Sequence, residues 1–150
     1  MAGQNSRAKA SKQKPCPLHE VVAERLYTVS DENFKPEYLS GITTVIDMSG
    51  KMGIIPSPEK YLRVVWSTED NVDEGQFEGV VRLVSSSMKG RKQKVLLVGH
   101  QDTVDTVATC VMREFIGCDP QVALDVMRSY RPNCMTKSEL IETVFKYKPS

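Results

Sequence analysis

The sequence lacks any long run of apolar residues and any excess of charge of one sign. No apolar stretch approaches the roughly 20 residues that a membrane-spanning helix needs, and no signal-peptide pattern opens the chain. The 20 basic and 19 acidic side chains give a formal net charge of +1. Such a balance gives no overall electrostatic bias toward nucleic acid or a membrane surface. We therefore expect a soluble chain that does not act at a membrane.

Histidine and closely spaced cysteine are also scarce. The histidines are His19 and His100, and the four cysteines are Cys16, Cys110, Cys118 and Cys134. No two cysteines form a Cys-x-x-Cys pair, which argues against a structural zinc site. We therefore expect no metal and no cofactor. We interpret the cysteines as thiols in a reducing compartment and expect a cytosolic or nuclear protein.

The chain divides into a short tail and one domain. Residues 1–15 carry four basic side chains, no acidic one, and no large apolar residue after Met1. Such a segment cannot bury enough surface to fold, so we expect it to be disordered. A basic arm can bind nucleic acid or serve as a nuclear address, although a solubilising terminus is the simpler interpretation. Residues 16–150 have the length of a single domain.

Apolar spacing predicts that strands alternate with helices along this domain. Residues 42–48 and 61–66 are rich in β-branched and aromatic side chains, which favour strands. The continuous apolar run 95–98 indicates a strand covered on both faces. Helical spacing predicts an amphipathic helix over 74–88 and three more in the C-terminal half. This order favours an α/β fold with a central, mostly parallel sheet of four to five strands flanked by helices.

The candidate site follows the apolar run 95–98. The polar stretch GHQDTVDT, residues 99–106, interrupts the apolar run and predicts a tight loop. From Val104, within this stretch, apolar spacing predicts a helix. In open α/β sheets, ligands bind beyond the carboxyl end of such a strand, on the loop that leads into the helix. The candidate positions are Gly99, His100, Gln101, Asp102, Thr103, Val104, Asp105 and Thr106.

The order of these segments resembles that of a dual-specificity protein tyrosine phosphatase domain, over roughly residues 18–147. The matching segments are RLYTVSDENFKPEYLSGITTVIDMS, YLRVVW, the strand and helix around GHQDTVDT, and DPQVALDVMRSYRP. In that family, the loop after the central strand reads His-Cys, then five residues, then Arg. The cysteine thiolate attacks phosphorus, backbone amides surround the phosphate, and the arginine binds two of its oxygens. The resemblance implies the family's fold.

The chain departs from this loop at every reactive position. Gly99 stands at the histidine position, His100 at the cysteine position and Thr106 at the arginine position, while Thr103 replaces the loop glycine. None of the four cysteines is followed six residues later by an arginine. Losing the nucleophile of a catalytic unit costs on the order of 10⁴ to 10⁶ in rate. We therefore predict that the chain is not a phosphatase.

The general-acid position and the charge of the loop also argue against phosphatase activity. The family's aspartate aligns with Thr68 without gaps, so we interpret Thr68, Glu69 and Asp70 as a vestigial general-acid loop. We also expect Asp102 and Asp105 to face the position of a bound phosphate. A pair of like charges about 4 Å apart repels by roughly 4 kcal/mol at an effective dielectric constant of about 20. This repulsion would oppose phosphate binding itself.

Two function classes follow. The first is a catalytically inactive domain, as in the STYX-like pseudophosphatases, that binds a protein partner as an interaction or scaffolding module. The second is a nucleic-acid-associated module, related to RNA 5′-triphosphatase-like domains, that uses the basic tail.

Other chemistry at the loop is a further alternative. His100 could act as a base oriented by Asp102 or Asp105, or these three could bind a metal casually. GHQDTV also resembles the His-x-Asp metal-ligand segment of zinc aminoacylases, but His19 is the only other histidine and the chain is too short for that catalytic domain. The simplest interpretation is that these polar side chains close the loop and cap the following helix.

Overall fold

The computed structural model describes residues 18–49, 60–63, 74–90, 92–134 and 137–149. Within these segments five strands form one sheet in the order β1-β2-β5-β3-β4. The strands are β1 (His19–Val22), β2 (Leu26–Ser30), β3 (Thr44–Asp47), β4 (Lys60–Arg63) and β5 (Val95–Gly99). β1 pairs antiparallel with β2, and all other pairs are parallel. The predicted α/β fold with a mostly parallel sheet is confirmed.

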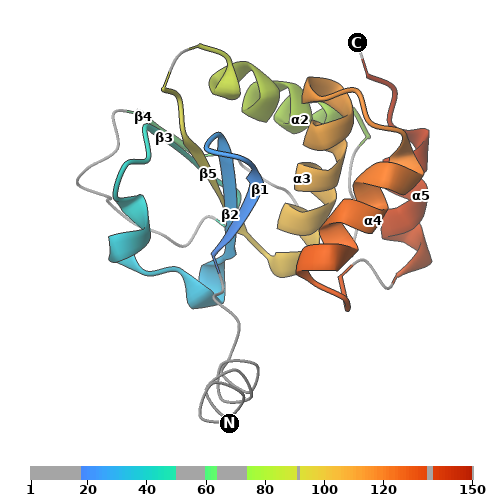
Figure 1. The fold of residues 1–150 in the computed structure, drawn as a ribbon, viewed down its shortest axis with the longest axis horizontal. Coiled ribbons are helices and arrows are strands. Elements are labelled where there is room, and N and C mark those ends of the chain that lie inside the picture. The colour runs from blue at the N-terminus through green and yellow to red at the C-terminus, as the bar shows by residue number, and fades with distance from the viewer. Residues whose placement is uncertain (1–17, 50–59, 64–73, 91, 135–136, 150) are drawn as a thin grey trace, which may run out of the picture.

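Helices cover both faces of the sheet, but unequally. The long ones are α2 (Glu74–Met88), α3 (Gln101–Phe115), α4 (Pro120–Tyr130) and α5 (Ser138–Lys146). They lie together on one side, whereas two short 3₁₀ helices, η1 (Asp31–Asn33) and η2 (Pro36–Leu39), lie on the other (Figure 1). The predicted helix over 74–88 is confirmed. None of the described helices is long and apolar enough to cross a membrane.

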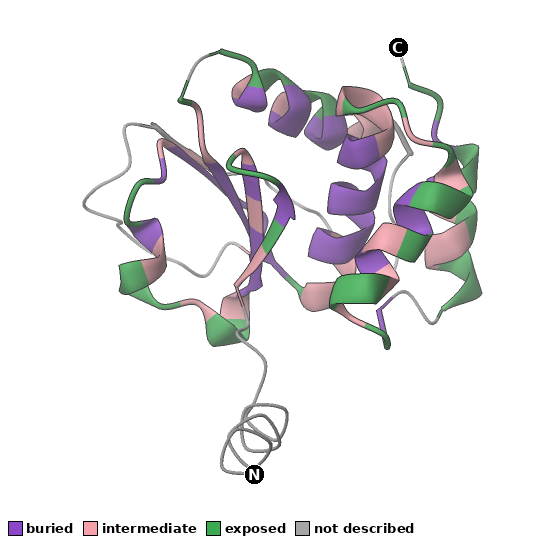
Figure 2. Ribbon diagram, viewed as in Figure 1, coloured by how far each residue is buried: buried purple, intermediate pink, exposed green. Residues whose placement is uncertain are grey.

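The central strand β5 is buried on both faces, as its continuous apolar run predicts. Val95 and Leu97 pack into the cluster under the four α-helices. Leu96 and Val98 pack into the smaller cluster under η1 and η2. All four side chains have 0% exposure, and the central strands β2, β3 and β5 are largely buried (Figure 2). Burying a side chain of this size stabilises the fold by about 1.5–3 kcal/mol, so β5 holds the residues that follow it in a fixed place.

Several predicted boundaries shift. The strand predicted over 42–48 is shorter, since β3 spans only Thr44–Asp47. The strand predicted over 61–66 begins at Lys60, and its part beyond Arg63 lies outside the described residues. Two 3₁₀ helices follow Ser30 and not one continuous helix, because Phe34 and Lys35 between them are extended. The predicted tail, residues 1–15, also lies outside the described residues.

Candidate functional site

The carboxyl ends of the parallel strands meet at one edge of the sheet. There β2 ends at Ser30, β3 at Asp47 and β5 at Gly99, with Ser30 beside Gly99 in the register. This edge is where open α/β sheets bind ligands. Here β5 passes into α3 through a single intervening residue, His100.

The predicted polar loop after β5 is wrong. α3 begins at Gln101, three residues before the predicted start at Val104. The N–H of Val104 donates a hydrogen bond to the carbonyl oxygen of His100 at 2.9 Å. The hydroxyl of Thr106 donates to the carbonyl oxygen of Asp102 at 2.7 Å. The stretch from Gln101 through Thr103 to Thr106 therefore forms the first turns of a helix, in which the backbone N–H of Val104 is already bonded within the helix.

His100 is the residue that precedes this helix. Its backbone is extended, with φ −59° and ψ 138°, and its side chain makes no capping hydrogen bond to the helix end. The residue is exposed to solvent. The interpretation that a polar side chain caps the helix therefore does not hold for His100.

Gly99 is closely surrounded at the point where the sheet edge turns into α3. A β-carbon built on Gly99 would lie 3.2 Å from the β-carbon of Met48 and 3.3 Å from a methyl carbon of Val104. Both neighbours are buried. Met48 and Val104 therefore fill the space beside Gly99. A histidine, which the phosphatase loop has at this position, would not fit without moving them.

We expect Gly99→Ala to lower the free energy of unfolding by about 1 kcal/mol, because an added methyl group in a packed interior forces its neighbours apart. Denaturant unfolding of both proteins measures the change. Gly79→Ala in α2 is the matched control, because nothing lies within 4 Å of a β-carbon there. This control should gain about 0.5–1 kcal/mol from helix propensity. A Gly99→Ala protein as stable as the unmodified chain would contradict the close packing.

Asp105 is a fully buried acidic residue of the candidate site. Its side chain has 0% exposure, and its Oδ2 lies 3.2 Å from Nε of Arg131, which follows α4. The side-chain amide of Gln101 donates to Oδ1 at 3.0 Å. Burial raises the pKa of Asp105, and the charge of Arg131 and the hydrogen bond from Gln101 oppose that rise. This network joins the start of α3 to the end of α4.

This pairing corrects the expectation that both aspartates face a bound phosphate. The carboxylate of Asp105 is directed at Arg131 and Gln101, and it is therefore not placed to orient His100 as a base. Asp102 is more exposed, and its Oδ2 lies 3.7 Å from Nζ of Lys137 in a solvent-facing ion pair. Such pairs contribute little to stability. Asp102 is nevertheless an acidic residue in the first turn of α3, where a negative charge stabilises the helix and disfavours an anion.

The two buried cysteines of the described segments, Cys110 and Cys134, do not resemble activated nucleophiles. Burial raises the pKa of the Cys110 thiol to about 12. Burial and the charge of Asp105 raise the pKa of Cys134. A thiol with a raised pKa stays protonated near neutral pH and is a poor nucleophile. Cys110 is thus a packing residue inside α3, as the sequence suggests.

The sequence reasoning missed two residues that shape this edge. One is Arg131, the partner of Asp105, which the sequence presents only as the end of a helix before Pro132. The other is Asp47, which is fully buried at the end of β3. It accepts hydrogen bonds from the N–H of Ser49 at 2.8 Å and from the hydroxyl of Tyr61. An acidic residue ending an apolar strand was the available signal for Asp47.

Two further points concern the alternative of a metal site and the predicted general-acid loop. Among the residues that the structure describes, no group of three or more histidine, cysteine or acidic side chains is placed to hold a metal ion. The predicted general-acid loop, Thr68, Glu69 and Asp70, lies outside the described residues.

Comparison with known proteins gives the fold a family context. No protein-family model and no curated protein matches the chain. Solved structures do match. Human DUSP28 is 19% identical with a TM-score of 0.67, over 89% of this chain and 94% of that one. A mouse putative dual specificity phosphatase complexed with zinc tungstate is 18% identical with a TM-score of 0.67, over 91% and 89%. DUSP15 is 15% identical with a TM-score of 0.71, over 86% and 85%. At these identities the likeness concerns the fold alone: the chain has a dual-specificity-phosphatase-like α/β fold.

Proposed function

We propose that the chain is a non-catalytic, STYX-like phosphatase domain that serves as a protein-interaction or scaffolding module. The early start of α3 carries this proposal. A phosphate-binding loop presents successive backbone N–H groups to one anion, whereas a helix uses its N–H groups internally after the first turn. The N–H of Val104 is already bonded to His100. The residues aligned with the phosphate loop therefore offer an anion little more than an ordinary helix end.

The chemistry of the side chains supports the same proposal. His100 stands in place of the attacking cysteine, and Thr106, in place of the arginine, is 3% exposed. The described thiols with shifted pKa values are shifted upward. A phosphate monoester is among the slowest substrates to hydrolyse without catalysis, so a site without nucleophile and arginine gives no measurable turnover.

We expect the full chain to show no turnover above background with phosphotyrosine and phosphothreonine peptides, at least about 10⁴-fold below a competent enzyme. His100→Ala should leave this background unchanged. Release of inorganic phosphate measures both. Robust turnover that is lost in His100→Ala would overturn the proposal, because the histidine would then be doing the work of the missing cysteine.

The basic tail favours one alternative, a nucleic-acid-associated module. Residues 1–15 carry Arg7, Lys9, Lys12 and Lys14 without an acidic residue. Filter binding to RNA over a salt series tests it, because phosphate contacts make affinity fall steeply with salt. An affinity that deletion of residues 1–15 leaves unchanged would contradict this alternative. For both functions we propose a cytosolic or nuclear location.

A further inference from the structure

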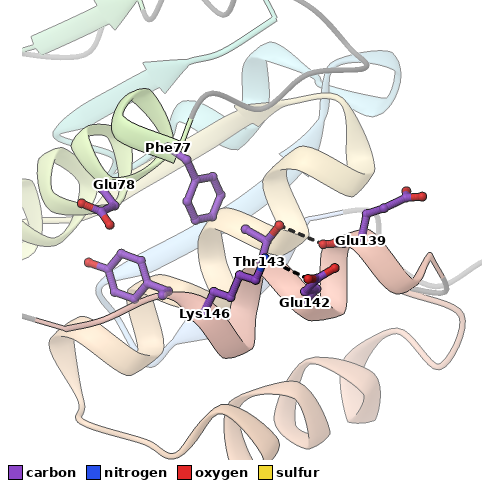
Figure 3. Close-up of a pocket in the computed structure, with 7 residues that line it drawn as sticks. Phe77, Glu78, Glu139, Glu142, Thr143 and Lys146 are labelled. Atoms are coloured by element: carbon purple, nitrogen blue, oxygen red, sulfur yellow. Dashed lines mark hydrogen bonds and ion pairs between the residues drawn. The ribbon is translucent and has the colours of Figure 1, made fainter.

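A cavity of about 260 Å³ lies between α2 and α5, away from the β5–α3 junction (Figure 3). Two aromatic rings line it. Phe77 comes from the first turn of α2, and Tyr147 directly follows α5. Their ring centroids are 6.4 Å apart, and the rings meet edge to face at 77°. Thr143 and Lys146 lie on the side of α5 that faces Phe77. The cavity therefore combines an aromatic floor with a polar rim.

The rim is predominantly acidic. Three glutamates line the cavity, Glu78 on α2 and Glu139 and Glu142 on α5, against the single ammonium group of Lys146. The carboxylate of Glu139 is directed away from Phe77 (Figure 3), so Glu78 and Glu142 supply the acidic groups of the rim. Nζ of Lys146 lies 2.8 Å from Oε1 of Glu142, and Glu78 lies 3.8 Å from Arg82. Both pairs are formed by side chains that are at least 42% exposed. Pairs of this kind are weak, so an incoming cation can compete for these carboxylates.

The end of α5 that forms the cavity wall is held in place from α3. Nη1 of Arg113 donates to the carbonyl oxygen of Val144 at 2.9 Å and also to that of Tyr147. The hydroxyl of Tyr147 donates to Oε1 of Glu114 at 2.7 Å. A cation at the last carbonyl groups of a helix also stabilises its dipole. The aromatic floor is thus fixed before any ligand arrives, which reduces the entropy lost on binding.

The size and the chemistry of the cavity select one kind of ligand. Its volume is below the roughly 300–1,000 Å³ typical of small-molecule sites, so it suits a single side chain. Lysine and arginine have apolar stems that pack on aromatic rings and cationic ends that seek carboxylates. We propose that this cavity binds a lysine or arginine side chain from a basic segment of a protein partner. This inference rests on the proposed role as an interaction module.

A second cavity, on the neighbouring side of α2, limits where such a segment can lie. It has a volume of about 290 Å³, and Arg82 and Lys89 line it together with Glu114. Its two cations disfavour a basic ligand. The basic segment is therefore expected to lie on the α5 side of α2. The glutamates on that side attract it, whereas Arg82 and Lys89 on the other side repel it.

Fluorescence polarisation with the full chain tests the proposal. The probe is a labelled ten-residue peptide of lysine, arginine and glycine, and the reference is a peptide of the same length with glutamate and aspartate. We expect the basic peptide to bind more tightly, and the double variant Glu78→Lys/Glu142→Lys to weaken its binding about tenfold. The matched control is Glu32→Lys/Glu37→Lys, which makes the same change of net charge at exposed sites on η1 and η2 across the sheet and should leave binding unchanged.

Each result separates the proposal from its competitors. Equal binding of the two peptides, or equal losses in the cavity variant and in Glu32→Lys/Glu37→Lys, would overturn it. Deleting residues 1–15 should leave the affinity for the basic peptide unchanged. A severalfold rise after this deletion would overturn the assignment to a partner, because the chain's own tail would then compete for the cavity. The phosphate-release assay is independent of these variants, so failure of the cavity proposal and failure of the non-catalytic role are distinguishable.

Discussion

Replacing Arg131 by alanine should lower the free energy of unfolding by about 3 kcal/mol at pH 7. The substitution removes the cation 3.2 Å from Asp105, whose side chain has 0% exposure. A buried charge left without its partner typically costs 3–5 kcal/mol. We expect the lower end of this range, because Gln101 still donates to Asp105 and the carboxyl group can take up a proton. Denaturant unfolding at constant ionic strength measures the loss.

The stability lost on replacing Arg131 by alanine should increase as the pH rises. Burial already raises the pKa of Asp105, and Arg131 is the main opposing influence, so the variant raises that pKa further. A raised pKa gives stability that is present below the unfolded value of 3.8 and is lost as pH rises through the folded value. The difference between the two proteins should therefore be small near pH 4 and largest at neutral pH.

His19 adds to the same trend. Burial and the charge of Arg131 lower its pKa, so the unmodified protein loses stability when His19 is forced to take up a proton at low pH. Removing Arg131 relieves part of this loss. Arg131→Lys, which keeps the charge, should retain most of the stability at neutral pH. A difference between Arg131→Ala and the unmodified protein that does not change with pH would contradict the Asp105–Arg131 pairing.

The sequence predicted most of the layered fold because its signals are local. The apolar run of β5 required burial on both faces, and the spacing of Val80, Val81 and Val84 on α2 required one buried helix face; both are observed. The start of α3 was mispredicted because its signal is not local. In the sequence an aspartate at position 105 suggests an exposed loop. It can be buried in α3 because Arg131, 26 positions away, pairs with its carboxylate.

The cavity between α2 and α5 was missed for a related reason. Glu139 lies in the first turn of α5, where an acidic side chain is common at the start of any helix. Phe77 and Tyr147 are 70 positions apart in the sequence. Both side chains belong to the hydrophobic core, which is a sufficient explanation for an aromatic residue at each position. Only the tertiary fold, in which α2 and α5 both pack on α3, places their rings side by side and next to the glutamates of the rim. No pattern within either segment indicates that arrangement.

The early start of α3 also predicts that restoring the phosphatase residues will not restore activity. The variant would combine His100→Cys and Thr106→Arg with asparagine at Asp102 and Asp105. Thr106 is 3% exposed and bonded to the carbonyl oxygen of Asp102, so an arginine there must bury its charge or unwind the helix. We expect the free energy of unfolding to fall by about 3 kcal/mol or more.

Phosphate release by this fourfold variant should remain at background, measured at a temperature where circular dichroism shows it folded. His100→Cys alone is the control; position 100 is exposed, so its stability should lie within about 0.5 kcal/mol of the unmodified chain. A thiol at the N-terminus of a helix gains thiolate character, and this control thus provides a nucleophile without a phosphate loop. Turnover well above background in the fourfold variant would mean that residues 100–106 can leave the helix and surround a phosphate. The barrier to catalysis would then lie in four side chains and not in the backbone of α3.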